Sequence, residues 1–247
     1  MAADHDKTTP APAQARSEPA AKSQRAEIDA FIQRARTLAP PTEAGKRGRL
    51  IFALDATMSR QPTWDTACML QGEMFREAGS IGGLDVQLVY FRGLNECRAS
   101  RWVSDGAGLG DLMARIDCRG GHTQIRKVLS HARQESETRK VNALIYVGDC
   151  MEEDVDQLSQ LAGELGLIGV PVFIFQEGYD PKAERAFKEI ARLSRGAHCR
   201  FDAGSARQLR ELLTAVAVYA TGGRKALQDF REATRSDGAL RLLEQLG

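Results

Sequence analysis

The chain has 247 residues, of which 43% are hydrophobic and 27% are charged, as in an ordinary soluble protein. Its formal net charge of +1 argues against a nucleic-acid binder that works mainly through electrostatics, so we expect no nucleic-acid partner. No apolar run approaches the roughly 20 residues of a membrane span, and Met1 to Lys22 lack the apolar stretch of a secretory signal, so we expect no membrane contact.

The N-terminal part is expected to lie outside the main domain. Residues 1–23 are rich in Ala, Pro, Thr and Gln with almost no large apolar side chains, which predicts a disordered segment. Residues 24–48 are predicted to form an amphipathic helix over 24–38 and then a polar linker. Pro40 and Pro41 end this helix. It is indicated by apolar residues at helical spacing: Ile28, Phe31, Ile32, Ala35 and Leu38.

The main domain is predicted over residues 49–222. Leu50 to Leu54 form a continuous apolar run, typical of a strand buried on both faces. Further strands are predicted at Leu84–Phe91, Val141–Val147, Val170–Phe175 and His198–Phe201, with Cys97–Val103 as a short antiparallel edge strand. Helices are predicted from Pro62 to about Ala78 and at Leu109–Ile116, His122–Gln134, Val155–Leu165, Arg185–Leu193 and Leu209–Ala220. This alternation predicts an α/β fold whose sheet is mostly parallel and covered by helices on both faces.

Residues 223–247 are predicted to be a C-terminal helical extension. We expect one or two small, exposed helices there, with Gly238 as a break between them.

Polar side chains gather where the predicted strands end. Asp55 follows the first strand and Asp149 follows a later one, so both should reach the carboxyl edge of one sheet, where open α/β sheets bind ligands. Thr57 and Ser59 alternate after Asp55 and can turn their hydroxyls the same way. Thr123 stands in a Gly-Gly loop that gives the backbone freedom to approach. Carboxylate and hydroxyl oxygens together predict a site for Mg²⁺ or Mn²⁺.

The order of these residues resembles the metal-ion-dependent adhesion site of von Willebrand factor type A domains. That motif is D-x-S-x-S followed by a distant Thr and a distant Asp, and the resemblance covers about residues 49–220. The matching positions are Asp55, Thr57, Ser59, Thr123 and Asp149, with Thr57 where the family usually has Ser.

The resemblance implies a three-layer, Rossmann-like α/β/α fold with a six-stranded, mostly parallel sheet and one antiparallel edge strand. It also implies a protein-binding module without enzymatic activity, in which Glu or Asp of a partner completes the coordination of the metal. Intracellular bacterial members of the family are commonly adaptors for ATPase or chaperone assemblies, which is the class of partner that the resemblance suggests.

The alternative is a haloacid-dehalogenase-like, Mg²⁺-dependent phosphohydrolase with Asp55 as its nucleophile. The other groups would be Thr123 for the phosphate, Lys127 or Lys140 as the cation, and Asp149 with Asp154 as metal ligands. That chemistry needs a second acid two residues after the nucleophile, and the position holds Thr57. We therefore expect no enzyme.

The cysteines indicate a reducing environment. The chain has five cysteines: Cys68, Cys97, Cys118, Cys150 and Cys199. Their odd number, their wide spacing and the lack of a CxxC pair predict reduced thiols and a cytoplasmic protein. Cys118, His122 and Cys150 all fall in loops near the predicted metal edge, so a thiolate-imidazole zinc site is a second alternative, although their spacing matches no common signature.

Two clusters of charge fall near the same edge. The acidic group Glu152, Glu153, Asp154 and Asp156 opens a predicted helix, where it would interact with the helix dipole or add negative potential beside a metal. The basic group consists of Arg60, Arg92, Arg98, Arg101 and Arg119. We expect it on the rim of this edge, either simply solvated or complementary to an acidic partner.

Overall fold

The computed structural model describes residues 47–60, 84–104, 111–201 and 206–246. The expectations for residues 1–46, for the helix after Pro62 and for the first part of the helix predicted at Leu109–Ile116 lie outside these ranges. Within them, no helix is long and apolar enough to span a membrane.

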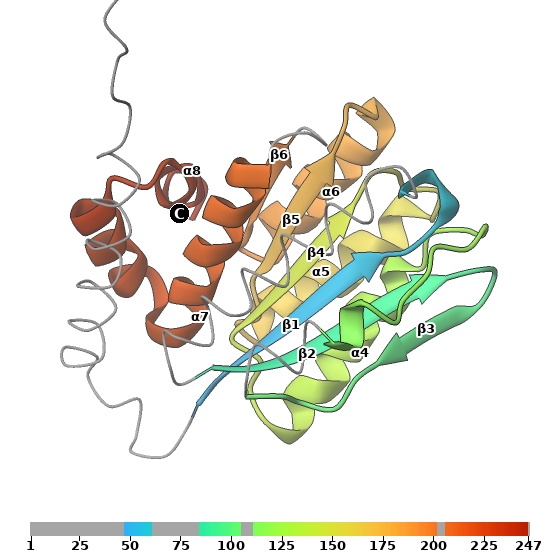
Figure 1. The fold of residues 1–247 in the computed structure, drawn as a ribbon, viewed down its shortest axis with the longest axis horizontal. Helices are drawn as coiled ribbons and strands as arrows, with labels where there is room; N and C mark the ends of the chain where they lie inside the picture. The colour runs from blue at the N-terminus through green and yellow to red at the C-terminus, as the bar shows by residue number, and fades with distance from the viewer. Residues whose placement is uncertain (1–46, 61–83, 105–110, 202–205, 247) are drawn as a thin grey trace, which may run out of the picture.

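A six-stranded sheet organises the described residues (Figure 1) in the order β3-β2-β1-β4-β5-β6. The strands are β1 (Gly48–Asp55), β2 (Leu84–Arg92), β3 (Glu96–Ala99), β4 (Ala143–Gly148), β5 (Val172–Glu177) and β6 (Ala197–Phe201). Neighbouring strands are parallel, except that β3 runs antiparallel to β2 at the edge. The predicted fold class, mostly parallel with one antiparallel edge strand, is confirmed.

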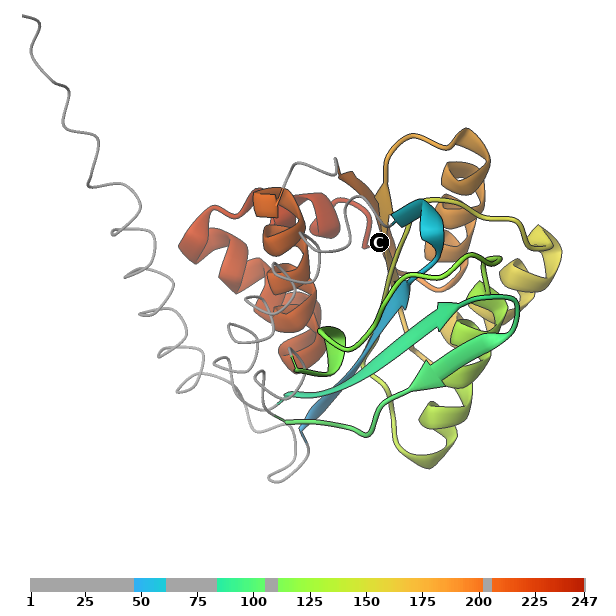
Figure 2. The ribbon, with the colours of Figure 1, turned by 45° about the vertical axis from the view of Figure 1, so that its right-hand side comes forward.

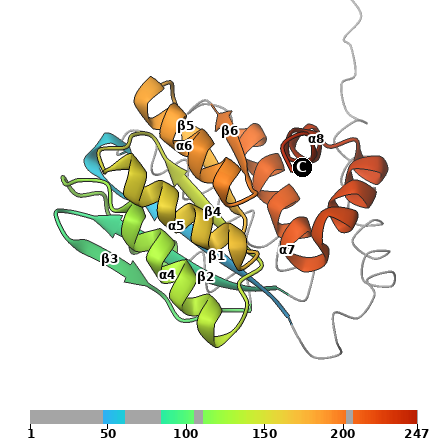
Figure 3. The same cartoon turned by 180° about the vertical axis from the view of Figure 1, so that it is seen from behind.

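Helices cover both faces of the sheet, which gives the molecule three layers (Figure 2). The helices α4 (Ile125–Thr138), α5 (Val155–Leu167) and α6 (Pro181–Leu193) lie on one face, as the view from behind shows (Figure 3). On the opposite face lie α7 (Ala206–Thr234) and α8 (Asp237–Leu243). The central strands β1, β4 and β5 are buried along their whole length, since each has an apolar layer on either side.

Strand alternation divides the core into two clusters. Leu50, Phe52 and Leu54 of β1 point into the cluster beneath α7 and α8, whereas Ile51 and Ala53 point into the cluster beneath α4, α5 and α6. Asp55 is therefore in register with the residues that face α4 to α6, and this places its carboxylate on that side of the sheet edge.

The C-terminal helices are part of the core, so the expectation that residues 223–247 form small exposed helices was wrong. Beyond a kink at Gly223, where φ is 68°, α7 continues to Thr234 and its Leu227 and Phe230 are buried. Gly238 lies inside α8 and packs against α7, because a Cβ there would lie 2.7 Å from the backbone of Glu211. This glycine permits a close helix contact and does not break a helix.

The C-terminal segment also closes the open edge of the sheet at β6. The side-chain amide of Gln245 accepts a hydrogen bond from the His198 backbone N–H at 2.8 Å and donates one to the His198 carbonyl at 2.9 Å. Arg241 donates to the Arg200 carbonyl at 3.0 Å. These side chains bond backbone groups that an edge strand otherwise offers to another chain.

Two glycines of α5 give opposite predictions for substitution by Ala. Nothing lies within 4 Å of a Cβ built at Gly163, so Gly163→Ala should raise the free energy of unfolding by about 0.5–1 kcal/mol through better helix propensity. A Cβ at Gly166 would lie 2.2 Å from the Leu193 carbonyl oxygen at the end of α6, so Gly166→Ala should lower it by about 1–3 kcal/mol. Urea denaturation of both variants measures this; equal effects would contradict the close packing of α5 on α6.

Candidate metal site

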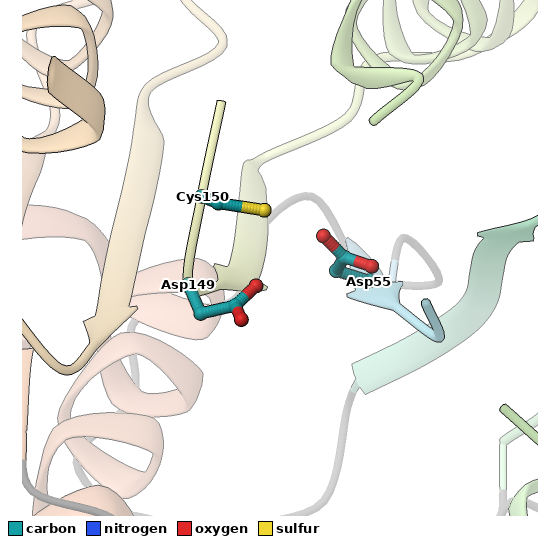
Figure 4. Close-up of side chains that lie close together, drawn as sticks. All are labelled: Asp55, Asp149 and Cys150. Atoms are coloured by element: carbon teal, nitrogen blue, oxygen red, sulfur yellow. The ribbon is translucent and has the colours of Figure 1, made fainter. Parts of the chain in front are cut away.

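The register of β1 and β4 brings two carboxylates together at the carboxyl edge of the sheet. Leu54 pairs with Val147, so Asp55, which ends β1, and Asp149, which follows β4, lie beside each other. The structure adds a third side chain that we did not predict as their partner, Cys150. Ligand atoms of the three residues all lie within 4.8 Å of one another, and the side chains point into a common space (Figure 4).

Three polar atoms near this space are buried without a hydrogen-bond partner. They are one carboxylate oxygen of Asp55 (Oδ2), one of Asp149 (Oδ1) and the hydroxyl of Tyr146. Tyr146 pairs with the small Ala53 on β1, and its hydroxyl reaches the end of β4, within 2.4 Å of where a Cβ of Gly148 would stand. Because buried polar groups are normally satisfied by protein, water or an ion, these atoms fit a bound cation.

The electrostatics of the cluster also favour a cation. Burial raises the pKa of Asp55 from its ordinary value of 3.8 to about 6, although two hydrogen bonds from Thr57 oppose the shift and Asp149 adds to it. Burial, followed by the charges of Asp149 and Asp55, raises the pKa of the Cys150 thiol to about 12. The negative forms of these groups are therefore destabilised, and a divalent cation would remove that penalty.

The loop after β1 carries the two predicted hydroxyl ligands. The Thr57 backbone N–H donates to Asp55 Oδ1 at 2.8 Å, and the hydroxyls of Thr57 and Ser59 share a hydrogen bond of 3.1 Å. A short 3₁₀ helix, η1 (Met58–Arg60), follows. Both hydroxyls thus lie on the loop that Asp55 itself holds in place.

A buried ion pair anchors this loop across the sheet. The side chain of Arg60 is fully buried, and its Nη2 lies 2.8 Å from Oε2 of Glu177, the last residue of β5. The loop therefore cannot move away from the ends of the strands without separating two buried charges, which is costly.

The predicted rim of exposed arginines was wrong for two of its five members. Arg60 is buried as described, and Arg92 is 8% exposed and pairs with Glu96 and Asp117. The remaining arginines are exposed: Arg98, Arg101 and Arg119.

Thr123 lies on a loop that packs against both neighbouring loops. The Arg119 N–H donates to the Ala56 carbonyl at 3.0 Å, which ties the loop to the end of β1. The Thr123 hydroxyl accepts a hydrogen bond from the Glu152 N–H at 3.1 Å, and the Thr123 N–H donates to the Glu152 carboxylate at 3.2 Å. Thr123 is 4% exposed and faces the loop that carries Asp149 and Cys150.

Two of the four acidic residues after Asp149 cap helices. Asp154 accepts from the Gln157 N–H at 3.0 Å as the N-cap of α5. Glu153 reaches across to α4 and accepts from the backbone N–H groups of Ile125 and Arg126. The sequence does not predict that Glu153 caps α4, because a strand separates the two along the chain and only the fold brings them together.

The structure does not gather the alternative zinc site. Cys118 is buried among the apolar residues beneath α7, and His122 is exposed and contacts Glu152 through Nδ1 at 3.1 Å. Among the described residues, Cys150 joins Asp55 and Asp149 and neither of these two.

The enzyme alternative gains no support from the positions of its other residues. Lys140 precedes β4 and so lies at the opposite edge of the sheet from Asp55. Lys127 binds Asn95 and Gln124, and Asp154 caps a helix.

Asp55 should limit the stability of the metal-free protein. Its folded-state pKa of about 6 exceeds the ordinary 3.8, so the native state holds the proton more tightly and stability falls as the pH rises between these values. We expect Asp55→Asn to raise the free energy of unfolding at pH 8 in EDTA by about 1–3 kcal/mol and to abolish stabilisation by Mn²⁺. Thermal and urea denaturation across pH 4–8 measure both effects. A destabilised Asp55→Asn protein in EDTA would contradict them.

A matched pair of glycines tests the loop that carries Thr123. A Cβ at Gly121 would lie 2.0 Å from the Gly93 carbonyl oxygen, whereas a Cβ at Gly120 would have nothing within 4 Å. Gly121→Ala should therefore displace the loop and weaken Mn²⁺ binding about tenfold or more, and Gly120→Ala should leave it unchanged. Calorimetric titration with Mn²⁺ measures this, and equal affinities for the two variants would mean that the loop does not contribute to the site.

Known structures resemble this fold, although no protein-family model and no curated protein sequence matches the chain. A von Willebrand factor type A protein from Catenulispora acidiphila superposes with a TM-score of 0.57 at 15% identity, over 70% of this chain and 43% of that one. An aerotolerance-related membrane protein from Bacteroides fragilis gives a TM-score of 0.55 at 15% identity, over 69% of this chain and 98% of that one. The SpRpn10 VWA domain gives a TM-score of 0.52 at 10% identity, over 66% and 95%.

The likeness is one of fold, since identity is at most 15% in these three structures and the match spans less than half of the Catenulispora chain. Two of the three are named for the same domain type, and the six-stranded sheet with one antiparallel edge strand and its helical layers agree with what the resemblance in sequence implied. The described part of this chain therefore has the fold of a von Willebrand factor type A domain.

Proposed function

We propose that the protein is a non-enzymatic binding module that engages Glu or Asp of a partner protein through a divalent cation. The cation, Mg²⁺ or Mn²⁺, would be held at the residues that the sequence singled out: Asp55, Thr57, Ser59, Thr123 and Asp149. The observation that carries this proposal is the convergence of Asp55 and Asp149, each with a buried oxygen that lacks a hydrogen-bond partner.

The charge balance of such a site favours a carboxylate as the incoming group. Two carboxylates and neutral hydroxyls leave little excess negative charge around a divalent ion, so a further anion can approach. Mg²⁺ and Mn²⁺ favour oxygen ligands, and a carboxylate from a partner supplies one at the open side of the sheet edge.

The surface around the same edge supports contact with a protein. Three large apolar side chains are exposed on the loops that follow β1, β2 and β5: Met58 is 55% exposed, Leu94 is 77% exposed and Tyr179 is 66% exposed. Apolar side chains around a charged centre suit an interface with an apolar part and a polar anchor.

The adaptor role and the setting belong to the same proposal. Among the described residues, Cys97, Cys150 and Cys199 are free thiols, which favours a reducing compartment such as the cytoplasm. An ATPase or chaperone assembly is the class of partner in which an adaptor of this fold would act.

A capture experiment with three conditions tests the proposal. The tagged protein is incubated with native lysate in Mg²⁺ or in EDTA, and the Asp55→Asn variant is incubated in Mg²⁺. We expect a specific partner to be retained only by the unchanged protein with Mg²⁺, because both the cation and Asp55 are needed to hold the partner's carboxylate.

Asp156→Asn is the matched control, since it removes an exposed carboxylate from the first turn of α5 without touching the cluster. It should retain the partner. A partner bound equally in EDTA and by Asp55→Asn would move the binding surface away from the metal edge.

A further inference from the structure

The cluster at the sheet edge contains a sulfur atom as well as oxygens. Cys150 Sγ belongs to the group of ligand atoms that lie within 4.8 Å of one another, together with the carboxylates of Asp55 and Asp149 (Figure 4). Cys150 is half-buried, and its thiol shares a hydrogen bond with the neighbouring Asp149 carboxylate.

A second observation points to a bound ion at this place. Asp55 is 0% exposed, and its Oδ2 has no hydrogen-bond partner. Asp55 Oδ1 is occupied, since it accepts from the Thr57 N–H at 2.8 Å, so Oδ2 is the oxygen left for a ligand. Asp149 Oδ1 and the Tyr146 hydroxyl are buried and unpartnered in the same region. These groups do not simply pack as part of the core, because leaving several polar atoms buried and unpaired is costly.

We propose that Cys150 is a protein ligand of this cation, so that the site takes a thiophilic divalent ion, Zn²⁺ or Co²⁺, in preference to Mg²⁺. The inference rests on the proposed function, since it concerns the same site, and it goes further by naming the ion that the site selects. On binding, the Cys150 thiol releases its proton to solvent and the thiolate forms the bond to the metal.

The preference follows from the chemistry of the donors. Mg²⁺ binds oxygen ligands in near-octahedral geometry and gains little from sulfur, whereas Zn²⁺ binds thiolate and carboxylate together in tetrahedral sites. Asp55, Asp149 and Cys150 supply three ligands and leave a fourth position open. A neutral water can fill that position, as it does in open zinc sites.

Cobalt gives a direct readout of sulfur coordination. The full chain is titrated with Co²⁺ under reducing conditions, and the near-ultraviolet band of sulfur-to-cobalt charge transfer is recorded. Zn²⁺ and Mn²⁺ affinities are measured in parallel by calorimetry. Cys97→Ser is the matched control, because Cys97 is also a half-buried free thiol but lies on β3, outside the cluster.

We expect the charge-transfer band in the unchanged protein and in Cys97→Ser, and its loss in Cys150→Ser. The Zn²⁺ affinity of Cys150→Ser should fall by about 10- to 100-fold or more, while its Mn²⁺ affinity changes far less because the oxygen ligands remain. The retained Mn²⁺ binding also shows that the variant is folded.

Two results would overturn the inference, and they differ in what they say of the proposed function. In the first, Co²⁺ binds through Asp55 but shows no sulfur-to-cobalt band, and Cys150→Ser leaves its binding unchanged. Cys150 is then not a ligand, but the metal site remains. Failure of Co²⁺, Zn²⁺ and Mn²⁺ alike to bind the unchanged protein removes the metal site itself, and with it the proposed function.

Discussion

The burial of the Asp55 carboxylate beside Asp149, at the ends of β1 and β4, is the constraint on which this edge of the molecule depends. Parallel strands in register place Asp55 and Asp149 side by side, and the hydrophobic layers on both faces of the sheet keep Asp55 away from water. A fold that needed only stability would place apolar or hydrogen-bonded groups there. The proposed function accounts for two carboxylates at this position, since a divalent cation would offset the cost of burying them.

The surrounding loops restrain one another, and each restraint crosses between elements that are distant in sequence. The buried pair of Arg60 and Glu177 fixes the loop after β1 to the end of β5. Glu153 caps α4 from the loop after β4, and Thr123 and Glu152 exchange two hydrogen bonds between the same two loops. The cluster is therefore surrounded by loops that are held by charge and hydrogen bonds, which keeps its ligand atoms close together before any ion binds.

The sequence was sufficient to predict the architecture, because each central strand is a short, uniformly apolar run followed by polar residues. It was less reliable for boundaries: α6 begins at Pro181, although Asp180 as N-cap and Pro181 at the first position were readable signals. The burial of Arg60 could not be predicted, since its partner Glu177 lies far along the chain and a lone arginine after a strand usually remains exposed. The sequence groups Cys150 with Cys118 and His122, whereas the fold brings it to Asp55 and Asp149, because spacing along the chain does not show which loops meet.

The closure of β6 by Gln245 depends on the turn that follows α8, because Gln245 lies just beyond the end of that helix. This side chain serves a backbone N–H and a backbone carbonyl of His198 at once, as a neighbouring strand would. A substitution that shortened this one side chain would leave the N–H and carbonyl of His198 open at the edge of the sheet, where another strand could bond them. Gln245 therefore covers backbone groups of β6 that would otherwise be open to pairing with a further strand.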